Sequence, residues 1–388
     1  MGFGKIAGRW MEKKCRFNRR IALICASTGL SLCLGLLLPR QWAYAAFERS
    51  GYYFVFVSFC IWLFFLAGTL RRHFGGRLRK YRLGLILSVA LIGLVFSVAP
   101  PKFKVLSDEA NLVGVSLAMY QDKTASLPIQ GLHIETEPFN PQVVPNKRPL
   151  LFSFVVSVLH SLLGYSPYHG LIVNFICAVI ILGLLYVFVY ENYSKTYAAL
   201  ALVVFVSFPI FSFWVPSSGF ETLNLLFVML TFLLLHQFIK KKRPSTGELI
   251  IWTLVMLLQC RYESVIFLIG LVFLMPHIAR REMIDRYSIA TFFAPLFLMP
   301  VLWQRKFFLN STEPVRVGLG LVETAQQGFD VSYLIQNFHK NIFVFSGLEA
   351  DFGFIAPYFV LAVCGAYLFV KQCLRKSEQN RFPSNPII

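Results

Sequence analysis

Residues 101–149 read PKFKVLSDEANLVGVSLAMYQDKTASLPIQGLHIETEPFNPQVVPNKRP, the longest polar stretch of the chain. They hold five acidic and five basic residues, whereas most of the sequence on either side is apolar. With 56% hydrophobic and 14% charged residues and a mean hydropathy of +0.62 over 388 residues, the chain is more apolar than a soluble domain of this size. The composition predicts an all-α, polytopic membrane protein whose water-side chemistry lies in this polar stretch.

The net charge of +18 and the eight cysteines each exclude a class of protein. The bases gather in short segments between apolar runs, so we interpret the charge as one membrane face in contact with anionic lipid, and we expect no nucleic-acid partner. The cysteines form no Cys-x-x-Cys pair and are absent from the two long polar loops, so neither a disulfide framework nor a thiolate metal site is predicted.

Three charge-free runs precede the polar stretch: residues 21–38, 52–70 and 83–100. Basic residues crowd the first 20 positions and the segment RRHFGGRLRKYR at 71–82, which places both on the cytoplasmic side. The first run is longer than the apolar part of a usual signal peptide, so we expect a retained anchor. The third span then delivers the polar stretch to the outer side, periplasmic or lumenal.

The run LLFSFVVSVLHSLLG at 150–164 is too short to be another span. At about 1.5 Å per residue it reaches about 22 Å, against a bilayer core of about 30 Å. Its polar residues recur every three to four positions, which puts them on one stripe, as on a helix lying along the membrane surface: Ser153, Ser157, His160, Ser161 and Gly164. We predict an interfacial helix at the outer face.

The remaining apolar runs complete a topology of ten spans with both termini in the cytoplasm. Two short runs flank Cys260-Arg261-Tyr262-Glu263, and one long helix through all of them would bury Arg261 and Glu263 at a cost of at least a few kcal/mol. We therefore predict a hairpin whose tip carries both residues at the outer surface. The later predicted spans are residues 170–190, 197–215, 222–239, 249–260, 264–276, 287–303 and 353–370.

This topology divides the chain into four parts. Residues 1–82 form an N-terminal extension with two spans, and residues 83–303 form the transmembrane core, which includes the outer loop 101–169. Residues 304–352 form a second outer loop, and residues 353–388 form the last span and a basic cytoplasmic tail.

Asp108 and Glu109 are the candidate catalytic residues, because they lie just after a span on the outer side, where a carboxylate can act as a base at the lipid boundary. The alternative is structural: Ser107 caps a helix whose first turn favours acids.

Lys147 and Arg148 close the same loop and suit a phosphate, although contact with ordinary lipid headgroups explains them equally well. Arg261 is a third outer cation, whose structural alternative is a salt bridge with Glu263 or Glu221. His133, Glu135 and Glu137 alternate as metal ligands do, but a hydrated loop edge is the commoner explanation.

Four segments in order resemble a known family: SDEANLVGVSLAMY (107–120), NKRPLLFSFVVSVLHSLLGYSP (146–167), SSGFETLNLLF (217–227) and QCRYESVIFL (259–268). They resemble membrane glycosyltransferases of the C-type fold (GT-C), in particular bacterial relatives of the dolichyl-phosphate-mannose protein mannosyltransferases and of the aminoarabinose transferase that acts on lipid A. The resemblance covers roughly residues 83–303. The two spans before it and the short tail after it depart from the family pattern.

The resemblance implies roles for single residues. An acidic residue of the first outer loop acts at the acceptor, which by position is Asp108, with Glu109 beside it. A Lys-Pro-Pro-like motif contacts the lipid phosphate; Lys147 and Pro149 match it, with Arg148 in place of the first proline. Arg261 matches the basic residue at the hairpin tip. Glu221 matches an acidic position after an earlier span, with Glu263 as further support.

The function expected is inverting transfer of a sugar from a polyprenyl-phosphate donor to a lipid, glycan or protein acceptor at the outer face of a bacterial inner membrane. No nucleotide-binding motif is present, as expected when the sugar arrives on a lipid. We expect no organic cofactor, and the ligands of the family's metal site, where one exists, have no counterpart that we can place. The alternatives are a lipid-linked glycan translocator and a non-catalytic membrane subunit of cell-envelope assembly, both of which tolerate change at Asp108.

Overall fold

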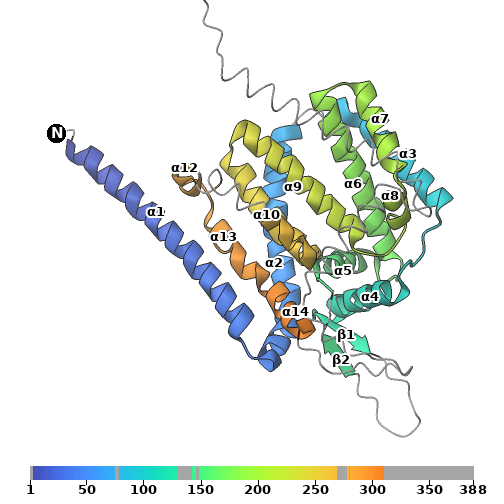
Figure 1. Ribbon diagram of the computed structural model, residues 1–388, viewed down its shortest axis with the longest axis horizontal. Coiled ribbons are helices and arrows are strands. Elements are labelled where there is room, and N and C mark those ends of the chain that lie inside the picture. Colours follow the sequence, from blue (N-terminus) through green and yellow to red (C-terminus); the bar gives the residue numbers. More distant parts are fainter. Residues whose placement is uncertain are drawn as a thin grey trace, which may run out of the picture. The chain divides into compact units, whose positions relative to one another are not determined.

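The computed structural model describes residues 3–74, 78–129, 142–145, 148–268, 278 and 280–309, which all belong to one compact unit, Met1–Ser311. This part of the chain is almost entirely helical (Figure 1). One short antiparallel ribbon, with Ser126 opposite Pro145, interrupts the helices. Its strands are β1 (Ser126–Ile129) and β2 (Gln142–Pro145). The helices are α1 (Phe3–Leu32), α2 (Arg40–Phe74), α3 (Arg82–Val98), α4 (Leu106–Gln121), α5 (Leu151–Leu163), α6 (His169–Asn192), α7 (Lys195–Val206), α8 (Pro209–Trp214), α9 (Glu221–Lys241), α10 (Pro244–Cys260), α12 (Arg281–Ile284), α13 (Ile289–Phe292) and α14 (Met299–Leu309).

Within these residues, five helical segments are long and apolar enough to cross a membrane. They are Phe17–Leu37, Arg40–Arg72, Arg79–Val98, His169–Asn192 and Glu221–Lys241. The prediction of an all-α membrane protein is therefore confirmed in its helical, membrane-embedded character. The predicted span 353–370 and most of 264–276 lie outside the described residues.

Two predicted spans are not continuous helices. The segment 197–215 breaks between α7 and α8, because Pro209 has no N–H to donate into the preceding turn. The segment 287–303 consists of α13, a 3-10 turn at Ala294–Leu298 and the start of α14. The apolar composition of these segments gave no sign of the interruptions.

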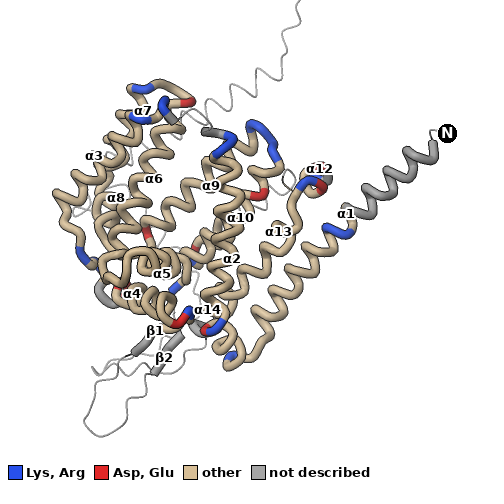
Figure 2. The backbone as a smooth tube through the Cα atoms, turned by 180° about the vertical axis from the view of Figure 1, so that it is seen from behind, with Lys and Arg blue, Asp and Glu red and all other residues tan. Residues whose placement is uncertain are grey.

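The helices pack into a bundle with basic residues clustered at one end. Helix α9 packs on α10 and α6, α2 packs on α10, and α3 packs on α6. A close approach joins the last pair: a Cβ atom at Gly84 of α3 would lie 2.2 Å from the ring of Tyr186 of α6, so only glycine fits there. Figure 2 shows Lys and Arg gathered at the end where α9 gives way to α10, while α4, α5 and the ribbon lie at the other end.

Helix α5 is short, as expected, and only part of its predicted polar stripe faces water: Ser161 and Gly164 are exposed, but the other three residues are not. The side chains of Ser153, Ser157 and His160 are buried, and they face neighbouring helices. Ser153 Oγ donates to the Leu112 carbonyl of α4 at 3.0 Å, and Ser116 Oγ lies 3.0 Å from His160 Nε2. Hydrogen-bonding partners on α4 make burial of this stripe favourable, so α5 is a packed element between α4 and the bundle.

Candidate active site

The first turn of α4 carries both predicted acids, although its cap differs from the prediction. The residue before the helix is Val105, which has no side chain able to cap, so Ser107 lies inside the first turn and the predicted Ser107 cap is wrong. The unpaired N–H groups of this helix end require another acceptor. Glu109 supplies it.

Glu109 is 1% exposed, and backbone N–H groups surround its carboxylate. Its Oε1 accepts hydrogen bonds from the N–H groups of Lys104 at 2.9 Å and Val105 at 3.1 Å. Its Oε2 accepts from the N–H of Ser218 at 2.8 Å. The same turn is held from α6, where Asn174 Nδ2 donates to the carbonyls of Ser217 at 2.7 Å and Gly219 at 2.8 Å. Glu109 therefore both caps α4 and fixes the turn that precedes α9.

Asp108, one residue earlier, faces a different environment. Its Oδ2 lies 2.5 Å from Nη2 of Arg148, and the two side chains are 36% and 30% exposed. Among the residues that the structure describes, its Oδ1 has no hydrogen-bond partner. The carboxylate is thus oriented by one cation and still open to a further partner on the solvent side.

Arg148 interacts with three elements at this point. Besides the ion pair with α4, its carbonyl accepts from Gln304 Nε2 of α14 at 2.6 Å, and the Tyr262 side chain just beyond α10 contributes to raising its pKa. The hydrogen bond to Asp108 is the main cause that raises the pKa of Arg148, so this guanidinium stays positively charged. Pro149 follows it and is buried, two residues before α5 begins.

Arg261 lies where α10 ends, as the sequence predicted. Its backbone is extended, with φ −152° and ψ 126°, and a 3-10 turn (Tyr262–Val265) follows. Its Nε donates to Glu263 Oε2 at 3.1 Å, which is one of the two expected partners. Its guanidinium lies over the ring of Phe220, 5.7 Å from the centroid, at the residue before α9. With 40% of its side chain exposed, Arg261 remains accessible to a further anion.

Glu221 is the first residue of α9 and stands between these groups. The positive charges of Arg261 and Arg148 and the negative charge of Glu109 all act on it. Its Oε2 is buried and has no hydrogen-bond partner within the described residues. Gly219 makes room for it, because a Cβ atom there would lie 2.1 Å from that oxygen.

The structure thus gathers five of the seven predicted residues, Asp108, Glu109, Arg148, Glu221 and Arg261, around the turn before α9 and the end of α10, with Glu263 paired to Arg261. Lys147 lies outside the described residues, as do His133, Glu135 and Glu137. Sequence reasoning missed Tyr262, Gln304 and Asn174, and only the position of Tyr262 next to Arg261 could have indicated it. In the described part of the chain no three His, Cys, Asp or Glu side chains converge as metal ligands do.

One model of a known protein family matches part of the chain. Residues 147–303 match the family model described as dolichyl-phosphate-mannose-protein mannosyltransferase. The match includes the positions of Lys147, Arg148, Glu221 and Arg261, but it begins after α4, which carries Asp108 and Glu109. The matched segment is less than half of the chain, so it shows a similarity to this glycosyltransferase family over that segment. No curated protein and no solved structure matches the chain.

Proposed function

We propose that the chain is an inverting glycosyltransferase that moves a sugar from a polyprenyl-phosphate donor to a lipid, glycan or protein acceptor at the outer face of a bacterial inner membrane. The observation that carries this proposal is the ion pair between Asp108 and Arg148. It joins a carboxylate that is about one-third exposed to the segment that matches the mannosyltransferase family, and in it an acid lies next to the cation that we propose binds the phosphate.

Asp108 is the base in this proposal. The acceptor hydroxyl gives its proton to Asp108 and its oxygen forms a bond to the anomeric carbon. The bond from that carbon to the phosphate oxygen breaks, and its electron pair leaves with the lipid phosphate. Glu109 is the less suitable base, because three backbone N–H groups already occupy its oxygens and its side chain is buried. Its part is to position α4 and so Asp108.

Arg148 and Arg261 bind the phosphate, with Lys147 beside Arg148 in sequence. Negative charge grows on the leaving phosphate in the transition state, and fixed cations stabilise it most when water is scarce. A guanidinium presents a fork of donors that fits two phosphate oxygens at once. Glu263 holds Arg261 in place through its ion pair, and Glu221 adds a negative charge nearby.

The proposed topology has ten spans and both termini in the cytoplasm. The end of the bundle that carries α4 and α5 then faces the periplasm or lumen, and the base-rich end faces the cytoplasm, as positively charged loops usually do (Figure 2). No nucleotide is required at the outer face, because the sugar arrives on its lipid.

The experiment that tests the function is comparative mass spectrometry of lipids, envelope glycans and membrane proteins. Three strains are compared: one with the wild-type chain, one without it, and one that carries Asp108→Asn. We expect one sugar-bearing species to be present in the first strain and absent from the other two. Identical profiles in all three strains would contradict the proposal.

A further inference from the structure

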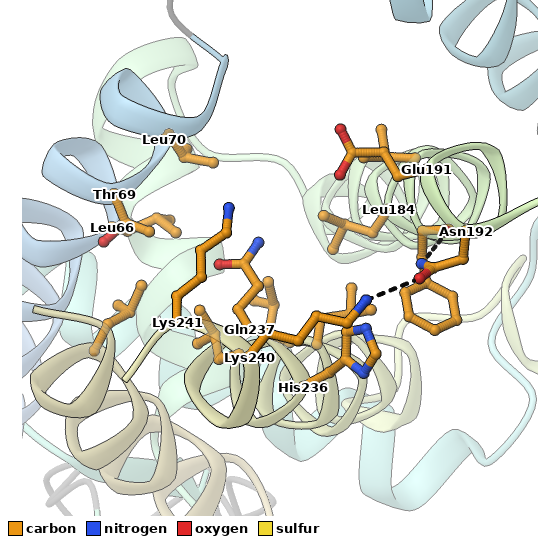
Figure 3. Close-up of a pocket in the computed structure, with 16 residues that line it drawn as sticks. Leu66, Thr69, Leu70, Leu184, Glu191, Asn192, His236, Gln237, Lys240 and Lys241 are labelled. Carbon is orange, nitrogen blue, oxygen red and sulfur yellow. Dashed lines mark hydrogen bonds between the residues drawn. The ribbon is translucent and has the colours of Figure 1, made fainter. Parts of the chain in front are cut away.

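A cavity lies at the end of the bundle opposite the candidate active site. It has a volume of about 220 Å³ and lies between α2, α6 and α9, with Leu249 of α10 at its edge (Figure 3). The two sites are about 30 Å apart along α9, because Glu221 begins that helix and Lys241 ends it and each residue adds about 1.5 Å. By the topology proposed above, the cavity opens near the cytoplasmic surface.

The interior of this cavity is apolar and its mouth is basic. Seven leucines line it, together with Val187 and Phe188, whereas Lys240 and Lys241 stand at its rim (Figure 3). A smaller cavity of about 150 Å³ adjoins it, sharing Thr69, Gln237 and Lys241 and adding Arg72 and Arg243. Together the two form one crevice, called the α2–α9 crevice below.

The charges of the α2–α9 crevice favour an anion. Four bases line it, against one acid, Glu191, whose carboxylate already accepts a hydrogen bond from Tyr81 OH at 2.5 Å. Lys240 Nζ donates to Asn192 Oδ1 at 3.1 Å, so that ammonium is held at the rim. Among the residues that the structure describes, the cations at this mouth outnumber the acids, an arrangement that an anionic group would stabilise.

Two buried polar atoms in the crevice wall also lack partners. Thr69 Oγ1 and His236 Nε2 have no hydrogen-bond partner among the residues that the structure describes. A buried polar group without a partner costs free energy, so these atoms indicate a ligand or water that hydrogen-bonds them. Both residues line the apolar cavity close to the basic rim.

We propose that the α2–α9 crevice binds an anionic phospholipid of the surrounding bilayer, with its phosphate among Arg72, Lys241 and Arg243 and part of an acyl chain between the leucines. The cavity is smaller than the roughly 300–1,000 Å³ that encloses a small-molecule ligand, so it holds only part of an amphipathic molecule whose remainder lies in the membrane. An apolar interior beside a basic rim matches a lipid chain beside its phosphate.

The test is native mass spectrometry of the detergent-purified full chain, titrated separately with dioleoylphosphatidylglycerol, dioleoylphosphatidylcholine and a polyprenyl monophosphate. Phosphatidylglycerol should bind more tightly than phosphatidylcholine. Arg72→Ala/Lys241→Ala removes two rim cations and should weaken phosphatidylglycerol binding about tenfold or more. The matched control, Lys195→Ala/Arg280→Ala, removes the same charge from exposed positions that line neither cavity and should change binding by less than about threefold.

A second variant tests the apolar part of the crevice independently of its cations. Leu233→Trp fills the apolar cavity and leaves every cation in place, so it should also abolish the preference for phosphatidylglycerol. Equal losses in the control and rim variants would show diffuse charge attraction and overturn the proposal. Equal binding of phosphatidylcholine, or retention of polyprenyl monophosphate without phosphatidylglycerol, would overturn it as well. None of these outcomes depends on sugar transfer.

Discussion

Asp108→Asn separates base catalysis from structural support at α4, since asparagine keeps the shape of the side chain but cannot take up a proton at physiological pH. The lost interaction is the ion pair with Arg148, whose two side chains are about one-third exposed. Such a pair contributes up to about 1 kcal/mol to the free energy of unfolding. Loss of a general base lowers the rate about a hundredfold to ten-thousandfold. The variant should therefore fold normally and lose nearly all sugar transfer.

Glu109→Gln is the matched control, because the two carboxylates are neighbours with different surroundings. The amide places an NH₂ group where a carboxylate oxygen now accepts backbone N–H bonds, so at least one buried donor loses its partner. The expected cost is about 1–3 kcal/mol of stability. The two variants should thus show opposite patterns, with Asp108→Asn stable and inactive and Glu109→Gln measurably destabilised.

The assay follows transfer from a polyprenyl-phosphate sugar in proteoliposomes, alongside thermal unfolding of the same purified samples. Near wild-type transfer by Asp108→Asn would refute the assignment of the base. A Glu109→Gln variant that is fully stable but inactive would instead move that role to Glu109.

Four further predictions follow from the same contacts. Arg261→Ala and Lys147→Ala should each lower kcat/KM for the lipid donor roughly tenfold to a hundredfold, because a charge-assisted contact is worth that much. The control Lys195→Ala should not lower it. An unchanged kcat/KM in the first two variants would show that these cations only contact lipid headgroups. Gly219→Ala should lower the unfolding temperature, because its Cβ would lie 2.1 Å from Glu221 Oε2, while Gly183→Ala, with open space around it, should not; equal melting of both variants would contradict the crowding. Burial and the neighbouring His169 lower the pKa of His160 to about 4, below its unfolded value, so the contribution of His160 to the free energy of unfolding should be full above about pH 6.5 and fall as the pH drops towards 4. His160→Asn should flatten the pH dependence of the unfolding temperature in thermal melts. An unchanged pH dependence in this variant would contradict the role of His160. In a cysteine-free background, Asp122→Cys should react with an impermeant thiol reagent from outside and Arg243→Cys should not; labelling of both would mean that residues 150–164 span the membrane.

The sequence alone predicted the structure correctly where the energetic cost of the alternative arises within one short segment. Two charges at Arg261 and Glu263 could not lie inside a bilayer, so the end of α10 was predicted at the correct residue. The short length of α5 was also predicted correctly, because the apolar run at 150–164 is bounded by Pro149 and Gly164 and the helix has 13 residues.

The sequence was insufficient where partners come from distant segments. Nothing near Glu109 indicates that its third hydrogen-bond donor is Ser218, more than a hundred residues later. The polar stripe of α5 looked suited to water because its partner Ser116 lies on another helix. Pro209 broke a predicted span because hydropathy counts a proline among apolar neighbours without regard to its missing N–H.

One measurement tests the central claim, that the chain transfers a sugar from a lipid phosphate, more directly than any variant. The purified full chain in proteoliposomes is given a polyprenyl-phosphate sugar labelled with ¹³C at the anomeric carbon, together with the lipid, glycan and protein fractions of the envelope. We predict that the label leaves the polyprenyl fraction, appears on one acceptor and has the inverted anomeric configuration by NMR. Label that only changes leaflet while still attached to the polyprenyl phosphate would contradict the account and identify a translocator.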